Sequence, residues 1–176
     1  MSKLSEHASS RRTWIICGLL VIVFLGLLAA QACLPVGTQI GNRAPDFALV
    51  DLGGNTVRLS DFRGKVVFLN FWTTQCPACR AEMPDMEDLY QEYKDEDVVV
   101  IGVDILESES TVRDFVEENE YSWTFVLDAN GEVYIQYGVI YIPASFFIDK
   151  DGIIRATRVG SMSLTMMEAN LAEAMK

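Results

Sequence analysis

Residues 66–79 of the chain read VVFLNFWTTQCPAC, and this stretch decides how the rest is organised. It opens with a run, Val66–Phe71, that is rich in β-branched and aromatic residues, which favour a strand. A run of this kind, without regular polar alternation, is typical of a strand buried on both faces of a sheet. Two cysteines follow after a short polar link, and Pro77 between them suits the first position of a helix. The stretch predicts an interior strand that delivers Cys76 and Cys79 to the first turn of a helix.

Cysteines at this spacing are suited to disulfide exchange, in which one thiolate attacks and a second thiol resolves the mixed disulfide. At a helix start, unpaired backbone amides and the helix dipole stabilise an anion, and thiol pKa values fall from about 8.5 to roughly 3.5–7.5. We therefore predict that Cys76 is the nucleophile and that Cys79, one turn later and better buried, resolves. A structural disulfide is the weaker interpretation, because the stabilisation from a crosslink grows with the loop that it closes.

Further side chains can be assigned to this dithiol from their spacing. Glu82 is three residues beyond Cys79 and therefore on the same helical face. A partly buried carboxyl there could take and return the proton of Cys79, although an ordinary surface glutamate near a helix start also fits. Asn70, in the predicted strand, can form hydrogen bonds beneath the site. For the bond before Pro143 the residues alone favour trans, because only about 5–6 % of such bonds are cis.

A Cys-x-x-Cys pair could instead bind a metal, but a zinc site needs two ligands more than this pair supplies. Cys17 and Cys33 belong to the apolar N-terminal segment, and the chain has no other cysteine besides Cys76 and Cys79. Its single histidine, His7, precedes that segment. A zinc site is therefore excluded, and we expect neither a metal nor another cofactor.

The N-terminal segment indicates where the protein is located. The run Trp14–Ala30 has no charged residue and is at the lower limit of the roughly 17–25 residues that a membrane-spanning helix needs. Arg11 and Arg12 in front of it should stay cytoplasmic, which places the rest of the chain outside. We therefore expect a cytoplasmic tail over 1–12, a transmembrane anchor or signal segment over 13–34, a linker over 35–43 and a folded domain over 44–176.

Two other fates of this segment fit the sequence. Residues Ala30-Gln31-Ala32 match a small-x-small cleavage site, which would release the domain. Cys33 at the same boundary resembles a lipoprotein acceptor, although Ala30 and Gln31 depart from the usual approach to one. All three fates place the domain in the cell envelope.

The domain is acidic. The chain carries a formal net charge of -11 at pH 7, and three of its 14 basic residues, Lys3, Arg11 and Arg12, lie in front of the domain. Phosphate binding needs a basic surface, so nucleic acid is excluded as a partner.

The rest of the domain alternates helical and strand patterns. Turn residues at 51–55 separate the alternating segments 44–49 and 56–59, which predicts a hairpin. Further strands are predicted at 98–103, 123–127, 144–148 and 153–159, and helices at 77–94, from 110, at 130–137 and from 163. The last helix is expected to bury Leu164, Met167, Leu171 and Met175. This order of elements indicates an α/β fold with a mixed sheet.

These motifs, in this order, resemble those of the TlpA/ResA type, membrane-tethered thiol–disulfide oxidoreductases with a thioredoxin fold. The resemblance runs from about Gly41 to the C-terminus. It is carried by residues 44–47 (APDF), 59–65 (LSDFRGK), 70–72 (NFW), 76–79 (CPAC), Glu82, Pro84, residues 102–104 (GVD) and Ile142-Pro143. It implies a three-layer α/β/α thioredoxin-like fold with a mixed sheet and an N-terminal β-hairpin extension, preceded by one membrane-anchor helix.

The resemblance also implies roles for individual residues. Cys76 attacks, Cys79 resolves, and the family's acid/base carboxylate matches Glu82. The implied substrate-positioning residues are Trp72, Gln75, Ile142 and Pro143, with the bond before Pro143 in cis. Asn70 stands where ordinary thioredoxins have a buried aspartate, which passes proton handling to Glu82. Gln75 replaces the aromatic residue usual before the first cysteine, which changes the surface that a partner meets.

On this basis we expect a thiol–disulfide oxidoreductase that acts outside the cytoplasm and reduces disulfides in envelope proteins, for example apocytochrome c. The resemblance implies a transmembrane thiol carrier of the CcdA/DsbD kind as the electron donor. Two alternatives stay open. A thiol peroxidase of the peroxiredoxin type resembles Pro-x-x-x-Thr-x-x-Cys, of which this chain has Thr73 but holds Leu69 at the proline's position. A non-catalytic binding module on the same fold is the other, although the intact cysteine pair argues against it.

Overall fold

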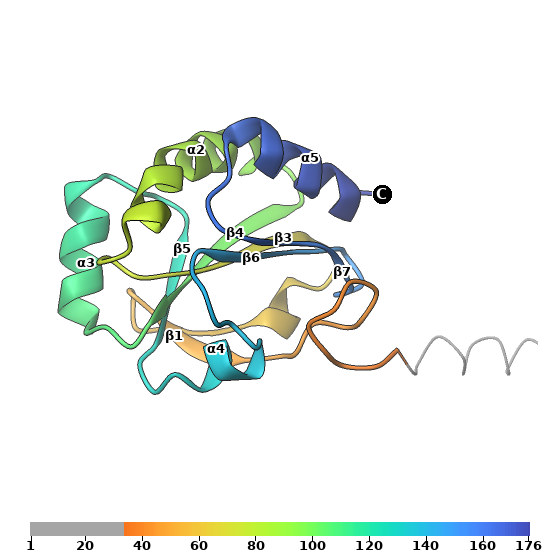
Figure 1. Cartoon of the computed structure of the whole chain (residues 1–176), viewed down its shortest axis with the longest axis horizontal. Helices are drawn as coiled ribbons and strands as arrows, with labels where there is room; N and C mark the ends of the chain where they lie inside the picture. The colour runs from red at the N-terminus through yellow and green to blue at the C-terminus, as the bar shows by residue number, and fades with distance from the viewer. Residues whose placement is uncertain (1–33) are drawn as a thin grey trace, which may run out of the picture. The chain divides into compact units, whose positions relative to one another are not determined.

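A single seven-stranded sheet runs through the part of the chain that the computed structural model describes, residues 34–176 (Figure 1). The predicted tail 1–12 and the predicted anchor or signal segment, apart from Leu34, lie outside the described residues. Among residues 34–176, none of the helices combines the length and the apolar character that a membrane crossing requires.

The order of elements follows the predicted alternation. Along the chain they are β1 (Ala48–Asp51), β2 (Thr56–Arg58), the 3₁₀ helix η2 (Leu59–Phe62), β3 (Val66–Trp72), α2 (Pro77–Tyr93), β4 (Val98–Ile105), α3 (Glu109–Glu118), β5 (Thr124–Asp128), α4 (Glu132–Gln136), β6 (Ala144–Ile148), β7 (Ile154–Val159) and α5 (Leu164–Ala174).

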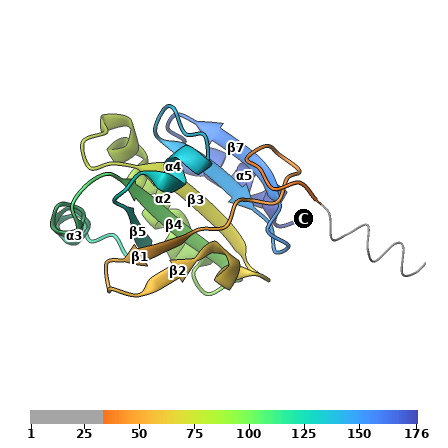
Figure 2. The ribbon, with the colours of Figure 1, turned by 90° about the horizontal axis from the view of Figure 1, so that it is seen from below.

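The sheet is mixed, as predicted. Its strand order is β2-β1-β5-β4-β3-β6-β7, and Figure 2 shows the strands fanned out with α4 in front of them. β3, β4 and β5 are parallel neighbours, whereas β6 and β7 continue the sheet antiparallel on the other side of β3. The predicted hairpin is β1 and β2, which joins the sheet through antiparallel pairing of β1 with β5. This is the thioredoxin-like arrangement with an N-terminal hairpin extension.

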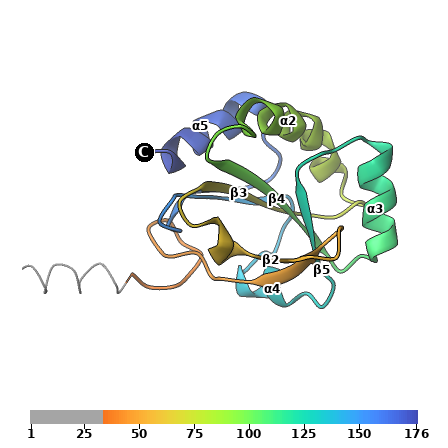
Figure 3. The same cartoon turned by 180° about the vertical axis from the view of Figure 1, so that it is seen from behind.

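β3 lies at the centre, and all seven of its residues are buried. Successive side chains of a strand point to opposite faces. Phe68 and Trp72 pack into the apolar layer under α2, α3 and α5, whereas Leu69 and Phe71 pack into the layer that η2 and α4 cover. Figure 3 shows α2 and α5 side by side on one side of the sheet and α4 on the other. Each fully buried side chain of this size contributes about 1.5–3 kcal/mol to folding.

Two details of the predicted helices are wrong. α5 ends at Ala174, so Met175 lies at its C-cap position and is 45 % exposed. Ala174 is buried in its place, because it continues the helical face of Met167 and Leu171, whereas Leu164 at the start of that face is only partly buried. The helix predicted at 130–137 is shortened to Glu132–Gln136, because Gly131 adopts a left-handed conformation with φ 73° directly before it.

The stacked pair Phe68 and Phe147 gives a test of the central layer. Their ring centroids are 4.6 Å apart and both side chains are fully buried. We expect Phe147→Ala to lower the free energy of unfolding by about 3–5 kcal/mol, because it removes apolar contact and leaves a cavity. Urea-induced unfolding measures this, with Val159→Ala, at a site that is 63 % exposed, as the control. A loss no larger than that of the control would contradict the packing described.

Candidate active site

The two cysteines lie at the start of α2, where the carboxyl end of β3 delivers them. Cys76 is the N-cap residue, and a disulfide joins it to Cys79 with their Cα atoms 5.3 Å apart. The Cys76 sulfur accepts a hydrogen bond of 3.1 Å from the backbone N–H of Cys79. Cys79 is fully buried, whereas Cys76 is partly exposed. The arrangement suits Cys76 for attack, because the helix N-terminus stabilises its thiolate in the reduced protein.

The loop before β6 lies directly against this sulfur. The Ile142–Pro143 peptide bond is cis, as the resemblance implies, and the trans bond that the residues alone favoured is wrong. The carbonyl oxygen of Ile142 is 3.9 Å from the Cys76 sulfur, and Pro143 is buried beside it. The structure therefore brings together two segments that lie 66 residues apart in the sequence.

Glu82 lies on the buried face of α2, the helix that starts at the dithiol, so the interpretation as an ordinary surface glutamate is wrong. Its side chain is 2 % exposed and accepts two hydrogen bonds. One comes from Asn70 Nδ2 at 2.9 Å, and the other from the backbone N–H of Met162 at 2.8 Å. Asn70 Nδ2 also donates to Ser145 Oγ at 2.9 Å. This confirms the expected hydrogen bonding of Asn70 beneath the site.

Burial raises the pKa of Glu82 to about 7. The hydrogen bonds from Met162 and Asn70 lower this pKa, and the charge of Asp85 raises it, but the loss of solvation is the largest of these effects. A carboxyl with a pKa in this range can both accept and return a proton at neutral pH. No sequence pattern indicated Met162 as a partner, because Met162 contributes its backbone N–H and not its side chain.

The remaining two predicted site residues have different surroundings. Trp72 is fully buried, with its indole 5.5 Å from the rings of both Phe115 and Phe125. Trp72 therefore supports the site from within the core and does not meet a partner directly in this structure. Gln75 is exposed next to Cys76, and its amide donates to Thr74 Oγ1 at 3.3 Å.

The sequence analysis did not assign a role to two acidic residues at the carboxyl end of β4, Asp104 in the strand and Glu107 in the loop after it. Glu107 accepts hydrogen bonds from the backbone N–H and the hydroxyl of Thr74, two residues before Cys76. Asp104, at the end of the same strand, is fully buried. The available signal was topological, because β3 and β4 are parallel neighbours and the residues that follow such strands meet at one edge of the sheet.

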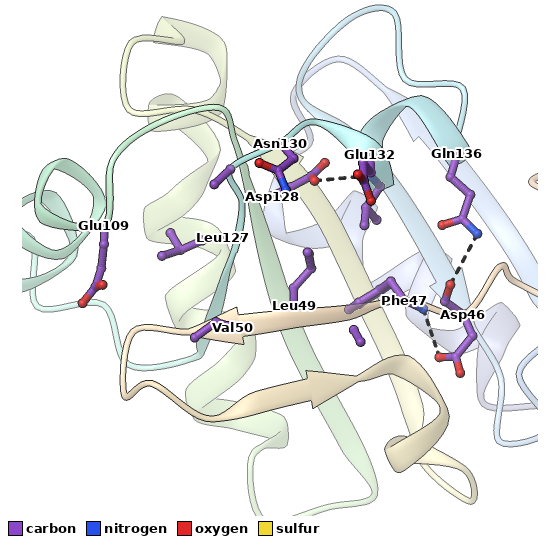
Figure 4. Close-up of a pocket in the computed structure, with 13 residues that line it drawn as sticks. Asp46, Phe47, Leu49, Val50, Glu109, Leu127, Asp128, Asn130, Glu132 and Gln136 are labelled. Carbon is purple, nitrogen blue, oxygen red and sulfur yellow. Dashed lines mark hydrogen bonds between the residues drawn. The ribbon is translucent and has the colours of Figure 1, made fainter.

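Two hollows lie near these elements. A cavity of about 650 Å³ is lined by β1, β5 and α4, and Figure 4 shows Asp46 and Phe47 of its wall near Gln136. Its lining includes neither cysteine. A second, more open hollow of about 510 Å³ is lined by Thr74, Gln75 and Arg80 together with residues of α3, so it adjoins the dithiol. Within residues 34–176, His, Cys, Asp and Glu side chains form no group of three that could hold a metal.

Glu82 should make the stability of the protein depend on pH. Its pKa is raised from 4.5 to about 7, so between these values the folded state binds more protons than the unfolded state. Stability from this group is therefore complete below about pH 4.5 and is lost as the pH rises through 7. Glu82→Gln should remove a decline on the order of 3 kcal/mol between pH 4.5 and pH 8.

Urea-induced unfolding at a series of pH values measures this decline. Glu92→Gln, at an exposed site of the same helix, is the control and should leave the slope unchanged. A Glu82→Gln protein that keeps the wild-type slope would contradict the assignment.

Comparison with known proteins agrees with this geometry. A model of the AhpC/TSA family matches residues 40–157. The thiol-disulfide oxidoreductase ResA of Bacillus thuringiensis subsp. konkukian (strain 97-27) is 41 % identical over 133 residues, which are 76 % of this chain and 77 % of that protein.

Solved structures agree as well. A crystal structure of a putative thiol:disulfide interchange protein DsbE from Chlorobium tepidum has a TM-score of 0.73 at 31 % identity, and covers 78 % of this chain and 99 % of its own. The pneumococcal exposed lipoprotein thioredoxin from Streptococcus pneumoniae strain TIGR4 has a TM-score of 0.66 at 32 % identity. The match covers 73 % of this chain and 99 % of the pneumococcal chain. The fold, the cysteine pair and these similarities agree, and the chain belongs to the family of ResA-like thiol–disulfide oxidoreductases with the thioredoxin fold.

Proposed function

We propose that this oxidoreductase reduces disulfides in proteins of the cell envelope. The observation that carries the proposal is the pairing of an accessible sulfur at a helix N-cap with a buried second cysteine and a buried carboxyl on the same helix. The accessible sulfur suits attack on a large partner. Buried Cys79 and Glu82 suit the resolving step, because that step takes place within the protein.

The reaction follows from these positions. The Cys76 thiolate attacks one sulfur of the target disulfide, whose S–S bond breaks, and the other target sulfur leaves as a thiolate that takes a proton. Cys79 then gives its proton to ionised Glu82, attacks the Cys76 sulfur and releases the second target thiolate. The target has gained two electrons, and the domain ends with the Cys76–Cys79 disulfide, the state that the structure contains.

Electrons have to return to this disulfide for a second turnover. We propose a transmembrane thiol carrier of the CcdA/DsbD kind as the donor and apocytochrome c as an example of the target. Support comes from the apolar N-terminal run behind Arg11 and Arg12, which favours a single-pass anchor with the redox domain outside. The structurally similar pneumococcal protein is named an exposed lipoprotein, which supports lipidation at Cys33 as the second form of attachment. A released form remains the third.

A thiol peroxidase is the alternative function that the match to the AhpC/TSA family supports. Leu69 replaces the proline that the peroxidase motif requires, and the paired Cys79 suits exchange with a protein disulfide. Peroxide consumption by the reduced protein separates the two functions, because a protein-disulfide reductase should consume it no faster than a free dithiol does.

Substitution of the resolving cysteine should trap the target. In cells that express Cys79→Ala, the mixed disulfide at Cys76 cannot be resolved and should accumulate as a covalent complex. Non-reducing electrophoresis followed by mass spectrometry identifies the trapped protein. The double variant Cys76→Ala/Cys79→Ala is the control and should trap nothing. A Cys79→Ala protein that captures no thiol protein would contradict protein-disulfide exchange.

The reduction potential tests the direction of electron flow. We expect a value near that of thioredoxin, about -270 mV, because a reductase has to be poised below its targets. Equilibration with glutathione or dithiothreitol buffers, read by alkylation of the free thiols, measures it. A value near -120 mV, that of a strong oxidant, would reverse the proposed direction.

A further inference from the structure

The turn that carries Cys76 is held by one acidic side chain, Glu107, from the loop between β4 and α3. The backbone N–H of Thr74 donates to Glu107 Oε2 at 2.5 Å, and the Thr74 hydroxyl donates to Glu107 Oε1 at 2.6 Å. Thr74 is buried, and the carbonyl of Thr73 accepts a hydrogen bond of 3.3 Å from the N–H of Cys76. The two hydrogen bonds from Thr74 to Glu107 therefore help to fix the backbone that leads to Cys76.

Both carboxyl oxygens of Glu107 act as hydrogen-bond acceptors toward Thr74. A carboxylate accepts from both donors without donating, whereas a glutamine amide has a single acceptor oxygen and would have to reverse the hydrogen bond with the Thr74 hydroxyl. Hydrogen bonds to a charged acceptor are stronger than those between neutral groups. The turn before Cys76 is thus fixed by a negative charge.

The backbone that places Glu107 is itself constrained. Leu106, the residue before it, has φ 61°, in the left-handed region that a branched side chain rarely adopts. The conformation is maintained by neighbours, because the N–H of Leu106 donates to the carbonyl of Asp128 at 3.2 Å. The N–H of Glu107 donates to Asp104 Oδ1 at 3.3 Å. Asp104 therefore anchors the loop from which Glu107 reaches Thr74.

The surroundings of Asp104 disfavour a charge on it. Its side chain is fully buried, and Oδ2 has no hydrogen-bond partner. Its partners across the paired strands are Trp72 and Leu127, neither of which brings a charge to it. Burial is the largest cause of a pKa raised to about 8 for Asp104, and the side chain and charge of Glu107 raise it further, whereas the hydrogen bond from the Glu107 N–H lowers it.

The charged groups around Asp104 add repulsion rather than compensation. Asp128 on β5 contributes a second negative charge, and no ion pair among residues 34–176 includes Asp104 or Glu107. The cations of the neighbouring helices are engaged elsewhere. Arg113 of α3 binds Glu109 and the carbonyl of Leu52, and Arg80 of α2 lies over the Phe115 ring. The side chains that α3 contributes to the apolar layer under α2, α3 and α5 are Val112, Phe115 and Val116, none of which is charged.

We propose that Asp104 is a positioning residue for the dithiol: as a neutral acid it holds the loop of Glu107, and ionised Glu107 fixes the turn that presents Cys76. The pair then carries one negative charge in place of two. When Asp104 loses its proton to solvent, its buried carboxylate lies beside that of half-buried Glu107, and their repulsion weakens the hydrogen bonds of Glu107 to Thr74. The inference rests on the proposed function, because it takes Cys76 as the reacting group.

The rate at which iodoacetamide alkylates Cys76 reports on this turn. The full-length Cys17→Ala/Cys33→Ala/Cys79→Ala protein leaves Cys76 as its single thiol, and the alkylation rate of Cys76 is measured in it from pH 6 to pH 10. We expect an inflection near pH 8 that Asp104→Asn removes, because the amide mimics the neutral acid and cannot ionise. The control Asp114→Asn changes the same charge at an exposed site of α3, in the hollow next to Thr74, and should keep the inflection.

Two further variants test the contact itself. Asp104→Ala and Glu107→Gln should each slow the alkylation of Cys76 about tenfold near pH 7, because the loosened turn presents the thiolate less well to the helix N-terminus. Asp104→Asn should restore most of the rate that Asp104→Ala loses. If Asp104→Ala does not fold, the Asn and Glu107→Gln variants decide the question.

The outcomes separate the inference from the proposed function. Identical pH profiles for the parent and Asp104→Asn, or loss of the inflection in Asp114→Asn, overturn the role of Asp104 while Cys76 remains reactive. A Cys76 that does not react with iodoacetamide at any pH overturns the proposed function instead.

Discussion

Burial of β3 on both faces is the constraint on which the rest of the structure depends. A strand with seven buried residues has to lie inside a sheet that helices cover on both sides. β4 and β6 pair with its two edges, and its side chains alternate between two apolar layers. The chain leaves this core at the carboxyl end of the strand and starts α2 at Cys76. The position of the dithiol is therefore a consequence of core packing.

The same burial determines the electrostatics around the sulfur atoms. Glu82 from α2 and Asp104 from the end of β4 are both held away from water, and both have pKa values raised into the range of 7 to 8. Their hydrogen-bond partners differ in kind. Glu82 is supported by Asn70 and by the backbone of Met162, whereas Asp104 has one unpartnered oxygen and an acidic neighbour. Glu82 is suited to proton transfer at neutral pH, and Asp104 to positioning the turn before Cys76.

Local patterns account for most of what could be predicted. The apolar run of β3, the proline after Cys76 and the turn residues between β1 and β2 each express a short-range preference, so their elements lie where the sequence indicated. The exposed Met175 shows where such patterns fail, because helical spacing alone does not say at which turn a helix ends. The cis bond before Pro143 is a second case. A base rate favoured trans, and only the similarity to a family pointed the other way.

By itself, the sequence determined the central strand, the identity of the two cysteines, their order of exposure and the helical face that carries Glu82. These features depend on residues close together in the chain, and backbone geometry relates them directly. Only the tertiary structure decided that Met162 and Ser145 complete the surroundings of Glu82 and Asn70, that Ile142 lies against the Cys76 sulfur, and that Glu107 grips Thr74. Those contacts join segments 33 to 80 residues apart, and they form because the parallel and antiparallel strands end at shared edges of one sheet.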